Sequence, residues 1–234
     1  MAIPIFYQEE LSDEPLLILT EEASKHIIQV LRMKEGEQLQ LTNGKGRIVT
    51  AEIISENRKA AEVKVVSTRD IATGTSKISI AISLIKNNSR FEWFLEKATE
   101  IGVSQIIPLI CERTEKQHFR HDRMKNILIS AMLQSQQAWL PILHEATKFN
   151  ELIISSTQEK KFIAHCDKQE KVSLHQHIST PAHQLICIGP EGDFTQQEIE
   201  SAKQNNFKPI SLGKTRLRTE TAGIVAAAIL LITE

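Results

Sequence analysis

The sequence has no excess of basic over acidic residues. Its 234 residues hold 28 Lys and Arg against 29 Asp and Glu, which gives a formal net charge of −1. A chain that binds nucleic acid over much of its surface would be strongly basic, so that class of protein is excluded. Residues 1–72 hold 9 basic against 12 acidic side chains, and the remainder holds 19 against 17. Any affinity for nucleic acid must therefore be local.

Cysteine is also scarce. Cys111, Cys166 and Cys187 lie in or beside apolar runs, and no CxxC pair is present. We therefore predict buried, reduced thiols in a cytoplasmic protein, without disulfides or structural zinc. His175 and His177 lie in a polar stretch with no further ligands nearby in the sequence. No metal is expected.

The sequence also shows no signal peptide and no candidate transmembrane helix. The first ten residues have neither the basic start nor the apolar centre of a signal peptide. The longest apolar run covers 222–232, which is too short to cross a bilayer. No membrane partner is expected.

Two glycine-containing loops organise the last quarter of the chain. Residues 188–200 (IGPEGDFTQQEIE) and 211–223 (SLGKTRLRTETAG) each follow a short apolar run and lead into a predicted helix. Thr195 and Glu198 have the spacing of a capping box, so a helix is expected to begin there. Two loops that leave the carboxyl ends of strands are where an open α/β sheet binds small molecules. Gly-Pro-x-Gly is also a common turn, so the glycines alone do not decide this.

The charges in these loops indicate the kind of ligand. A helix start attracts phosphate, yet this one carries Glu191 and Asp193 and no Lys or Arg. A ligand with a cationic centre, an amine or hydroxyl groups is favoured instead. Gly213, Lys214 and Thr215 look like the end of a phosphate-binding P-loop, but Lys208 stands where that motif needs glycine. An NTPase is therefore excluded.

Several short motifs carry a resemblance to a known family. They are GPEG before the acidic helix start, LG at 212–213, LRTETA at 217–222, ATEIGVSQIIPL at 98–109, ER at 112–113 and VLRMKEG at 30–36. Together they make the chain similar to the RsmE-type 16S ribosomal RNA uridine N3-methyltransferases of the SPOUT superfamily. The resemblance implies an α/β fold: a C-terminal SPOUT-type parallel sheet with a trefoil knot, and a small N-terminal PUA-like β-barrel.

The pattern of the first 72 residues agrees with a small, mostly β domain. Thr20 is predicted to cap a helix over 21–33, and an alternating strand leads to a turn at Asn43-Gly44. Further strands follow on either side of 57–59, as in a meander that closes into a barrel. By the resemblance, residues 1–72 are a PUA-like RNA-binding domain, and 71–76 is the expected linker.

The rest of the chain alternates strands with helices. A buried strand over 77–85 precedes a helix that Ser89 is predicted to cap, with Glu92 completing the box. Such alternation predicts a parallel sheet covered on both faces. Apolar residues from Met124 to Trp139 recur at helical spacing, which predicts a helix that ends before Pro141. By the resemblance, 73–234 is the SPOUT methyltransferase domain.

The resemblance also implies a cofactor, S-adenosyl-L-methionine, and a reaction, methyl transfer to N3 of a specific uridine in 16S ribosomal RNA. Arg218 is the candidate catalytic residue, because a cation would stabilise uracil that has lost its N3 proton. Glu220 is either the partner of Arg218 or a residue that favours the helix start. The candidate cofactor-binding residues are Gly189, Pro190, Glu191, Gly192, Leu212, Gly213, Leu217, Arg218, Thr219, Glu220, Thr221 and Ala222.

Basic residues that could contact an RNA backbone are concentrated in two places. Residues 113–125 gather five basic side chains against two acidic ones, and the second glycine loop holds Lys214 and Arg216 besides Arg218. A solvated loop and helix start would explain the first group equally well. The candidate RNA-binding residues are Arg113, Lys116, Arg120, Lys214 and Arg216.

The chain departs from the family pattern at 133–141. Leu133, Gln137 and Trp139 replace a Glu and two Arg in a segment that family members write EQSGRxRxP. This departure leaves a non-catalytic RNA-binding or ribosome assembly factor as one alternative. A SPOUT methyltransferase that acts on another RNA position is the second. By the resemblance, the expected partners are 16S ribosomal RNA or the small ribosomal subunit, and a second copy of the chain. Residues 222–232 are apolar on every side, which is compatible with a dimer and equally with core packing.

Overall fold

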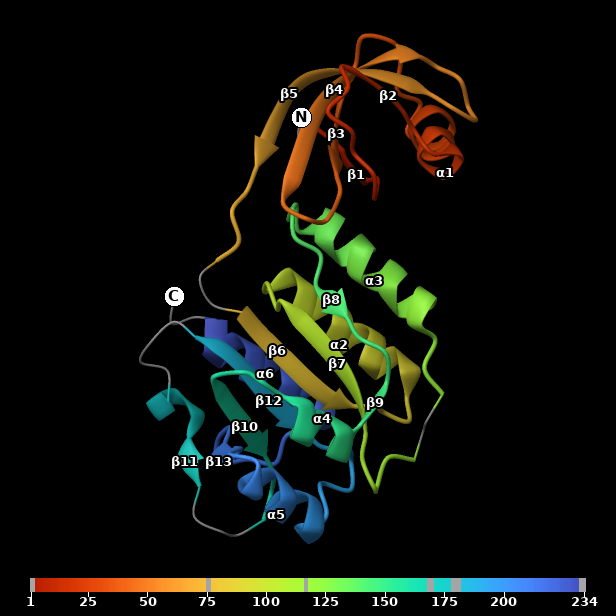
Figure 1. The fold of residues 1–234 in the computed structure, drawn as a ribbon. Helices are drawn as coiled ribbons and strands as arrows, with labels where there is room; N and C mark the ends of the chain where they lie inside the picture. The colour runs from red at the N-terminus through yellow and green to blue at the C-terminus, as the bar shows by residue number, and fades with distance from the viewer. Residues whose placement is uncertain (1–2, 75–76, 116–117, 168–170, 178–181, 232–234) are drawn as a thin grey trace. The chain divides into compact units, whose positions relative to one another are not determined.

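The structure is a computed structural model that describes residues 3–74, 77–115, 118–167, 171–177 and 182–231 (Figure 1). The chain divides into two compact units. Unit 1 is Met1–Thr73 with Met132–Leu140, and unit 2 is Gly74–Ala131 with Pro141–Glu234. The segment Met132–Leu140 lies inside the range predicted for the second domain but groups with unit 1. Residues 75–76 of the predicted linker lie outside the described residues.

Unit 1 is built on a five-stranded sheet in the order β1-β3-β4-β5-β2. β1 and β3 are parallel and the other pairs are antiparallel. Leu39 and Leu41 of the alternating strand are fully buried in the core, as their period of two predicts. The edge strands β1 and β2 do not pair within the described residues, so the predicted barrel is an open half-barrel. The strands are β1 (Ile5–Tyr7), β2 (Leu16–Ile18), β3 (Gln38–Thr42), β4 (Arg47–Ser55) and β5 (Glu62–Asp70).

The helix predicted over 21–33 is shorter and changes form. α1 (Glu21–Lys25) begins as expected, with the Thr20 side chain accepting a hydrogen bond from the Ala23 N–H. It then widens into the π-helix η1 (His26–Val30), which ends with the Leu31 N–H bonded to the His26 carbonyl. The prediction was wrong beyond Val30 because the backbone of Arg32 is left-handed, with φ of 58°.

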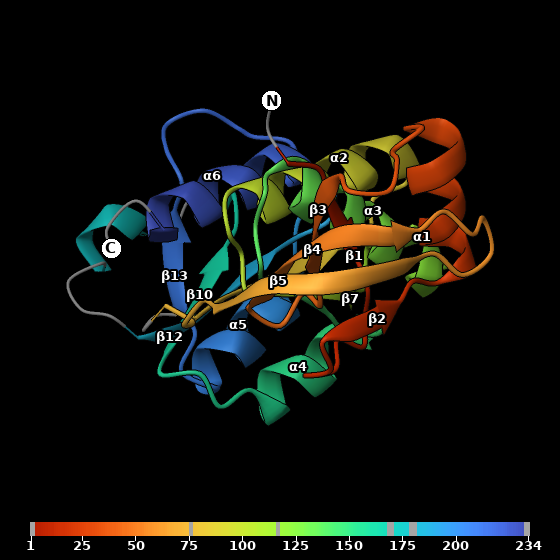
Figure 2. The same cartoon turned by 90° about the horizontal axis from the view of Figure 1, so that it is seen from above.

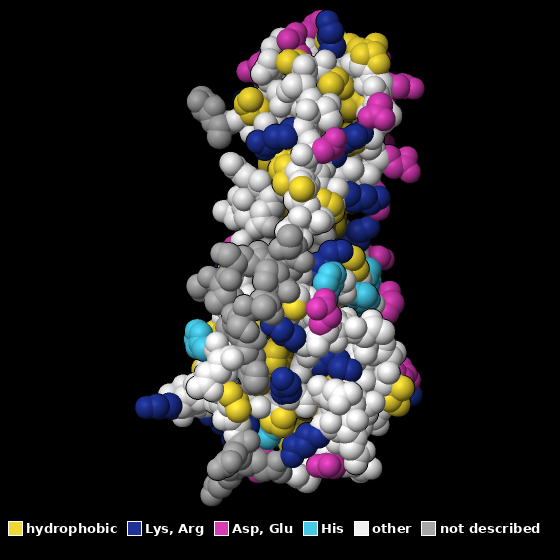
Figure 3. Space-filling view, turned by 60° about the vertical axis from the view of Figure 1, so that its left-hand side comes forward, with side chains coloured by type: hydrophobic (Ala, Val, Ile, Leu, Met, Phe, Trp, Pro, Cys, Tyr) yellow, Lys and Arg dark blue, Asp and Glu magenta, His cyan; other side chains and the backbone are white. Residues whose placement is uncertain are grey.

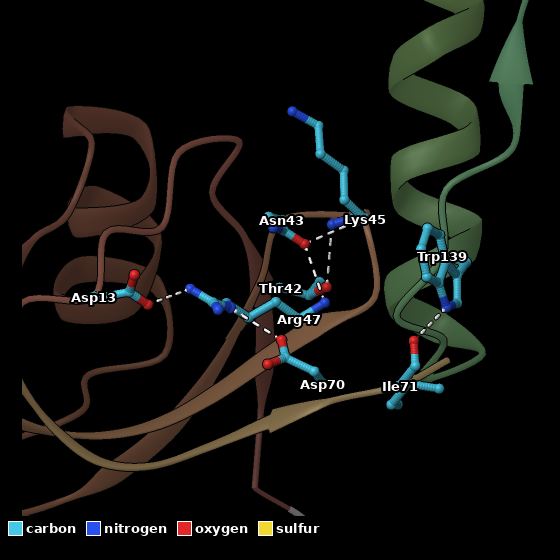
Figure 4. Close-up of polar contacts among 9 residues, drawn as sticks. Asp13, Thr42, Asn43, Lys45, Arg47, Asp70, Ile71 and Trp139 are labelled. Carbon is cyan, nitrogen blue, oxygen red and sulfur yellow. Dashed lines mark hydrogen bonds and ion pairs between the residues drawn. The ribbon is translucent and has the colours of Figure 1, made fainter. Parts of the chain in front are cut away.

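Trp139 is not part of a helix. α3 (His121–Gln134) ends earlier than predicted, and Gln136 reverses the chain with φ of 56°. The Trp139 indole then lies beside the turn at 43–47 and donates a hydrogen bond to the Ile71 carbonyl at 3.0 Å (Figure 4). The Asn43 side chain holds that turn by accepting from the Lys45 N–H at 2.8 Å. Packing within unit 1 therefore overrides the helical spacing of the sequence.

Replacing Gly46 with alanine is expected to destabilise unit 1 by about 3 kcal/mol, because a left-handed backbone cost adds to overpacking. Gly46 has φ of +93°, and a Cβ there would lie 2.4 Å from Trp139 Cζ2 and 2.7 Å from the Ile71 carbonyl oxygen. Gly36→Ala is the matched control, since Gly36 has φ of +87° with nothing within 4 Å of its Cβ position. Urea unfolding of both variants measures the difference. Equal losses would show that the Trp139 contact contributes nothing.

Unit 2 contains an eight-stranded sheet among its described residues, in the order β11-β13-β10-β12-β6-β7-β8, with β9 also on β7. Every described pair in it is parallel. The predicted parallel sheet is confirmed. The strands are β6 (Lys77–Ser83), β7 (Gln105–Ile110), β8 (Ile142–Leu143), β9 (Thr147–Lys148), β10 (Lys160–Ala164), β11 (Val172–Ser173), β12 (His183–Ile188) and β13 (Lys208–Ser211).

Helices cover both faces of this sheet. Figures 1 and 2 show α2 (Asn88–Glu100) and α6 (Thr219–Leu231) side by side on one face, and α4 (Phe149–Ser155) and α5 (Gln196–Gln204) on the other. The short 3₁₀ helix η2 (Leu174–His177) follows β11. Because parallel strands all end at the same edge, the loops after β6, β7, β10, β12 and β13 converge there.

The start of α2 differs from its prediction. Asn87 rather than Ser89 is the cap residue, and its side chain accepts from the Ser89 N–H at 2.9 Å. Glu92 does not complete a box, because it binds Arg123 at 2.8 Å. Asn is at least as good a cap as Ser, so the shift of two residues follows from the sequence NNS itself. No helix among the described residues is long and apolar enough to cross a membrane.

Candidate active site at the carboxyl ends of the parallel strands

The loop after β12 is fixed at both of its ends. The predicted capping box is confirmed: the Glu198 carboxylate accepts from the Thr195 N–H at 2.8 Å, and Thr195 Oγ1 accepts from the Glu198 N–H at 3.3 Å. At the other end, the Thr219 hydroxyl donates to the Gly189 carbonyl at 3.0 Å. This bond joins the first glycine loop to the start of α6. The two loops that organise the sequence therefore lie against one another.

Other loops at the same edge are tied to the first glycine loop by hydrogen bonds. The Asp193 carboxylate accepts from the Cys166 N–H at 2.8 Å, which links it to the loop after β10. Arg113 donates to the Gly192 carbonyl at 2.8 Å from the loop after β7. The Glu191 carboxylate accepts from the Lys86 N–H at 3.3 Å, which links it to the loop after β6. With the Thr219 bond, these contacts hold the loops after β6, β7, β10 and β13 against the loop after β12.

Two adjoining cavities open between these loops. The Gly189 cavity has a volume of about 310 Å³ and the Leu212 cavity about 400 Å³. They share Ala164, Cys166, Arg216, Leu217 and Ala222. Each is within the size range of sites that bind small ligands. An elongated ligand with chemically different ends could occupy both.

Most of the predicted cofactor residues border these cavities. The Gly189 cavity is lined by Gly189, Pro190, Glu191, Leu217, Arg218, Thr219, Glu220 and Ala222, and the Leu212 cavity by Leu212, Gly213, Leu217 and Ala222. Gly192 and Thr221 line neither. Gly192 instead packs under Arg113, whose Cδ would lie 3.3 Å from a Cβ at that position.

The Gly189 cavity is bordered by charges of both signs. Its cations are Arg90, Arg216 and Arg218. Glu220 is 7% exposed and forms its ion pair with Arg90, at 3.8 Å, rather than with Arg218. The proposed pairing of Glu220 with Arg218 is therefore not found among the described residues. The Arg218 side chain is exposed and available to a ligand.

The predicted RNA-binding residues are not all together. Arg216 borders both cavities and Lys214 borders the Leu212 cavity. Arg120 is exposed just before α3, and Lys116 lies outside the described residues. On the face drawn in Figure 3, Lys and Arg side chains are interspersed with Asp and Glu and form no single continuous patch. This agrees with a local rather than a general affinity for nucleic acid.

Sequence reasoning missed the contribution of two segments. Arg90, from the first turn of α2, and residues Ala164, His165 and Cys166, at the end of β10, all line the cavities. The signal was present for Arg90, because it follows the carboxyl end of the strand predicted over 77–85. His165 is buried, and that burial, together with Lys171, lowers the pKa of its imidazole. Within the described residues, no group of three or more His, Cys, Asp or Glu could hold a metal ion.

The three cysteines differ more than predicted. Cys111 and Cys187 are buried, but Cys166 is exposed, so the prediction was wrong for Cys166. Burial, with a smaller effect from Glu198, raises the pKa of Cys111 to about 12. Burial also raises the pKa of Cys187 well above its ordinary value. Both buried thiols stay protonated at neutral pH and are therefore unreactive.

We expect one fast-reacting thiol in the folded protein. At pH 8, a thiol-specific disulfide reagent should modify Cys166 quickly and the two buried cysteines only on unfolding. Because Cys166 borders both cavities, a ligand that fills them should slow its reaction at least tenfold at a saturating concentration, since modification then requires the free protein. Cys166→Ser removes the fast phase and serves as the control. Equal rates with and without a bound ligand would place that ligand elsewhere.

Two family models match the chain. The model described as RNA methyltransferase domain matches residues 73–231, and the model described as RNA methyltransferase PUA domain matches residues 19–66. The first covers more than half of the chain, and its range coincides with the parallel sheet and its helices.

Individual relatives match over nearly the full length. The ribosomal RNA small subunit methyltransferase E of Rickettsia conorii is 28% identical, covering 96% of this chain and 93% of its own. The protein of the same name from Bacillus subtilis is 28% identical, with coverages of 94% and 91%.

Solved structures are similar as well. The ribosomal RNA small subunit methyltransferase E of Neisseria gonorrhoeae, bound to S-adenosyl methionine, has a TM-score of 0.86 at 30% identity, covering 97% of this chain and 96% of that one. A Legionella pneumophila protein in complex with the bound cofactor SAM has a TM-score of 0.89 at 31% identity, with coverages of 98% and 97%.

Proposed function

The chain belongs to the RsmE family of small-subunit ribosomal RNA methyltransferases, and we propose that it transfers a methyl group from S-adenosyl-L-methionine to N3 of a specific uridine in 16S ribosomal RNA. The observation that carries this proposal is the pair of adjoining cavities that the two glycine loops line together. Relatives with the same fold are named as bound to this cofactor.

The residues present suit the cofactor. The Leu212 cavity offers the apolar side chains of Ile210, Leu212 and Leu217 beside the main chain of the second loop. Main-chain donors and acceptors together with apolar walls fit an adenine ring. The Gly189 cavity offers the carboxylates of Glu191 and Asp193, which favour a cationic centre such as a sulfonium. When bound, the cofactor supplies an already activated methyl group.

The protein's own residues must then align the acceptor and exclude water. Uridine N3 carries a proton and lies on the base-pairing edge, so the base has to be unpaired or flipped out before it reacts. We assign to Arg218 the stabilisation of the uracil anion, since its exposed side chain borders the Gly189 cavity. Arg113, Lys116, Arg120, Lys214 and Arg216 are the proposed RNA-backbone contacts.

The proposal extends to domains and partners. Residues 1–72 would be the PUA-like domain that helps to hold RNA, and 73–234 the methyltransferase domain of a cytoplasmic enzyme. We also propose a homodimer formed through α6, because Ile224, Val225 and Ile229 are only partly covered within the chain. Light scattering combined with size-exclusion chromatography measures the oligomeric state.

Two measurements test the function. Isothermal calorimetry with S-adenosyl-L-methionine should give saturable heat, whereas an assembly factor without a cofactor site would give none. Mass spectrometry of ribosomal RNA from a deletion strain should show one missing 3-methyluridine in 16S RNA. Loss of a different modification, or of one in transfer RNA, would favour another SPOUT activity and contradict the proposed specificity.

A further inference from the structure

Arg90 lies in the cavity where the acceptor base is proposed to react. It is the third residue of α2, which begins at the carboxyl end of β6 with Asn87 as its cap. From there its side chain borders the Gly189 cavity together with Arg216 and Arg218. Arg90 and Arg218 reach this cavity from different elements, one from α2 and the other from the loop after β13.

Glu220 explains why the Arg90 side chain stays at the cavity. Its side chain is 9% exposed, and a buried carboxylate is costly unless a cation accompanies it. Among the described residues, Arg90 forms the only ion pair with Glu220, between Nε and Oε1 at 3.8 Å. That separation is too long for a hydrogen bond, so the N–H donors of the guanidinium remain available.

The chemistry of uracil calls for more than one cation. N3 lies between the two carbonyl carbons, so the negative charge left by the N3 proton is shared by N3, O2 and O4. A single guanidinium beside one carbonyl oxygen leaves the charge on the other oxygen without a protein cation. A second donor would lower the free energy of the anion further, by the same electrostatic effect that operates in oxyanion holes.

Resting on the proposed function, we propose that Arg90 is a second catalytic cation, which donates to a carbonyl oxygen beside N3 of the target uracil and is held in place by Glu220. In the reaction the N3–H bond breaks and its proton passes to solvent water or buffer. The N3 electron pair forms the bond to the methyl carbon, while the S–CH₃ bond breaks and its electron pair stays on sulfur. The charges of the uracil anion and the sulfonium cancel, and 3-methyluridine and S-adenosylhomocysteine result. Glu220 is a positioning residue.

The rival role for Arg90 is a contact to an RNA phosphate. The two roles differ in what they respond to, because a phosphate contact affects RNA affinity whatever the acidity of the base. A cation that stabilises the anion matters less when the base is already acidic. Fluorine at C5 of uracil lowers the pKa of N3–H, so 5-fluorouridine separates the two roles.

The experiment uses the full-length enzyme under single-turnover conditions, with saturating enzyme and cofactor. The RNA carries either uridine or 5-fluorouridine at the position that the wild type methylates. Arg90→Met, which keeps the aliphatic stem but removes the charge, is expected to slow transfer to uridine about 30-fold, below the range for losing a main oxyanion donor. With 5-fluorouridine the defect should shrink to about threefold, as expected for a lost charge interaction. Arg90→Lys should recover part of the rate.

Glu220→Gln tests the positioning role. It keeps the shape of the side chain, and we expect it to slow methyl transfer about fivefold. The double variant with Arg90→Met should be no slower than Arg90→Met alone, because both residues act through one interaction. A structural effect of Glu220 alone would instead lower the rate further in the double variant. The melting temperature of each variant verifies that it is folded. The cofactor Kd of Arg90→Met, expected to change less than about twofold, verifies that the cofactor site is intact.

The outcomes are separable. If the wild type produces no 3-methyluridine, the proposed function fails. If the wild type is active and Arg90→Met is equally fast, the inference alone fails. Equal losses with uridine and 5-fluorouridine, accompanied by weaker RNA binding, would assign Arg90 to a phosphate and overturn its catalytic role. A shrinking loss at unchanged RNA affinity supports it.

Discussion

Arg218→Ala is expected to slow methyl transfer by about 10²–10³-fold, the range seen when one donor to a developing anion is removed. Its side chain is exposed at the Gly189 cavity, and the nearby buried carboxylate of Glu220 is paired with Arg90 instead. The guanidinium is therefore free to approach uracil. The Arg218 contribution to the fold is through its backbone carbonyl, which accepts from the Ala222 N–H at 2.8 Å and is unchanged by the substitution.

The cofactor should bind this variant almost normally, with a Kd within about threefold of the wild type, because only transition-state binding is lost. Calorimetry and single-turnover kinetics measure the two quantities separately. Arg216→Ala is the matched control, since Arg216 is also an exposed cation bordering both cavities. It should weaken RNA binding more than the rate at saturation. Weak cofactor binding at an unchanged rate in Arg218→Ala would contradict the catalytic role.

Local signals were the easiest part of the structure to predict. The Thr195–Glu198 box and the Thr20 cap are both present, because each depends on residues within one helical turn. The alternation of strands and helices predicts the parallel sheet. Because the loops that follow parallel strands converge at one edge of the sheet, 188–200 and 211–223 come together. The candidate site follows from this rule and from the family motifs.

Contacts between distant residues were harder to predict. The apolar side chain of Trp139 fits a helical pattern, but its partners Gly46 and Ile71 belong to another part of the chain. Arg90 looks like an ordinary surface residue near a helix start until Glu220 is seen beside it. Neither contact leaves a periodic signal. The trefoil knot stays a prediction from the resemblance, since strand order and register do not describe how loops thread.

Gly223→Val is expected to destabilise unit 2 by about 3 kcal/mol, at the upper end of the range for overpacked cores. Gly223 is buried in α6, and a Cβ there would lie 2.6 Å from Phe94 Cε2, 2.9 Å from Phe94 Cδ2 and 3.0 Å from Ile82 Cδ1. The Phe94 ring is fully buried, so it cannot relieve the contact by turning into solvent without exposing apolar surface. For a chain of this size the melting temperature of the unit should fall by roughly 6–12 °C.

The double variant with Phe94→Leu provides the control, because the smaller side chain makes room for the added methyl groups and should recover part of the lost stability. Function should be affected as well. Thr219, four residues before Gly223, holds Gly189 through its hydroxyl, and Ala222 borders both cavities. A shift of α6 away from α2 therefore displaces both glycine loops, and we expect cofactor affinity to fall about tenfold, the equivalent of 1.4 kcal/mol. Normal cofactor affinity in a destabilised Gly223→Val protein would mean that the loops hold the site without the packing of α6.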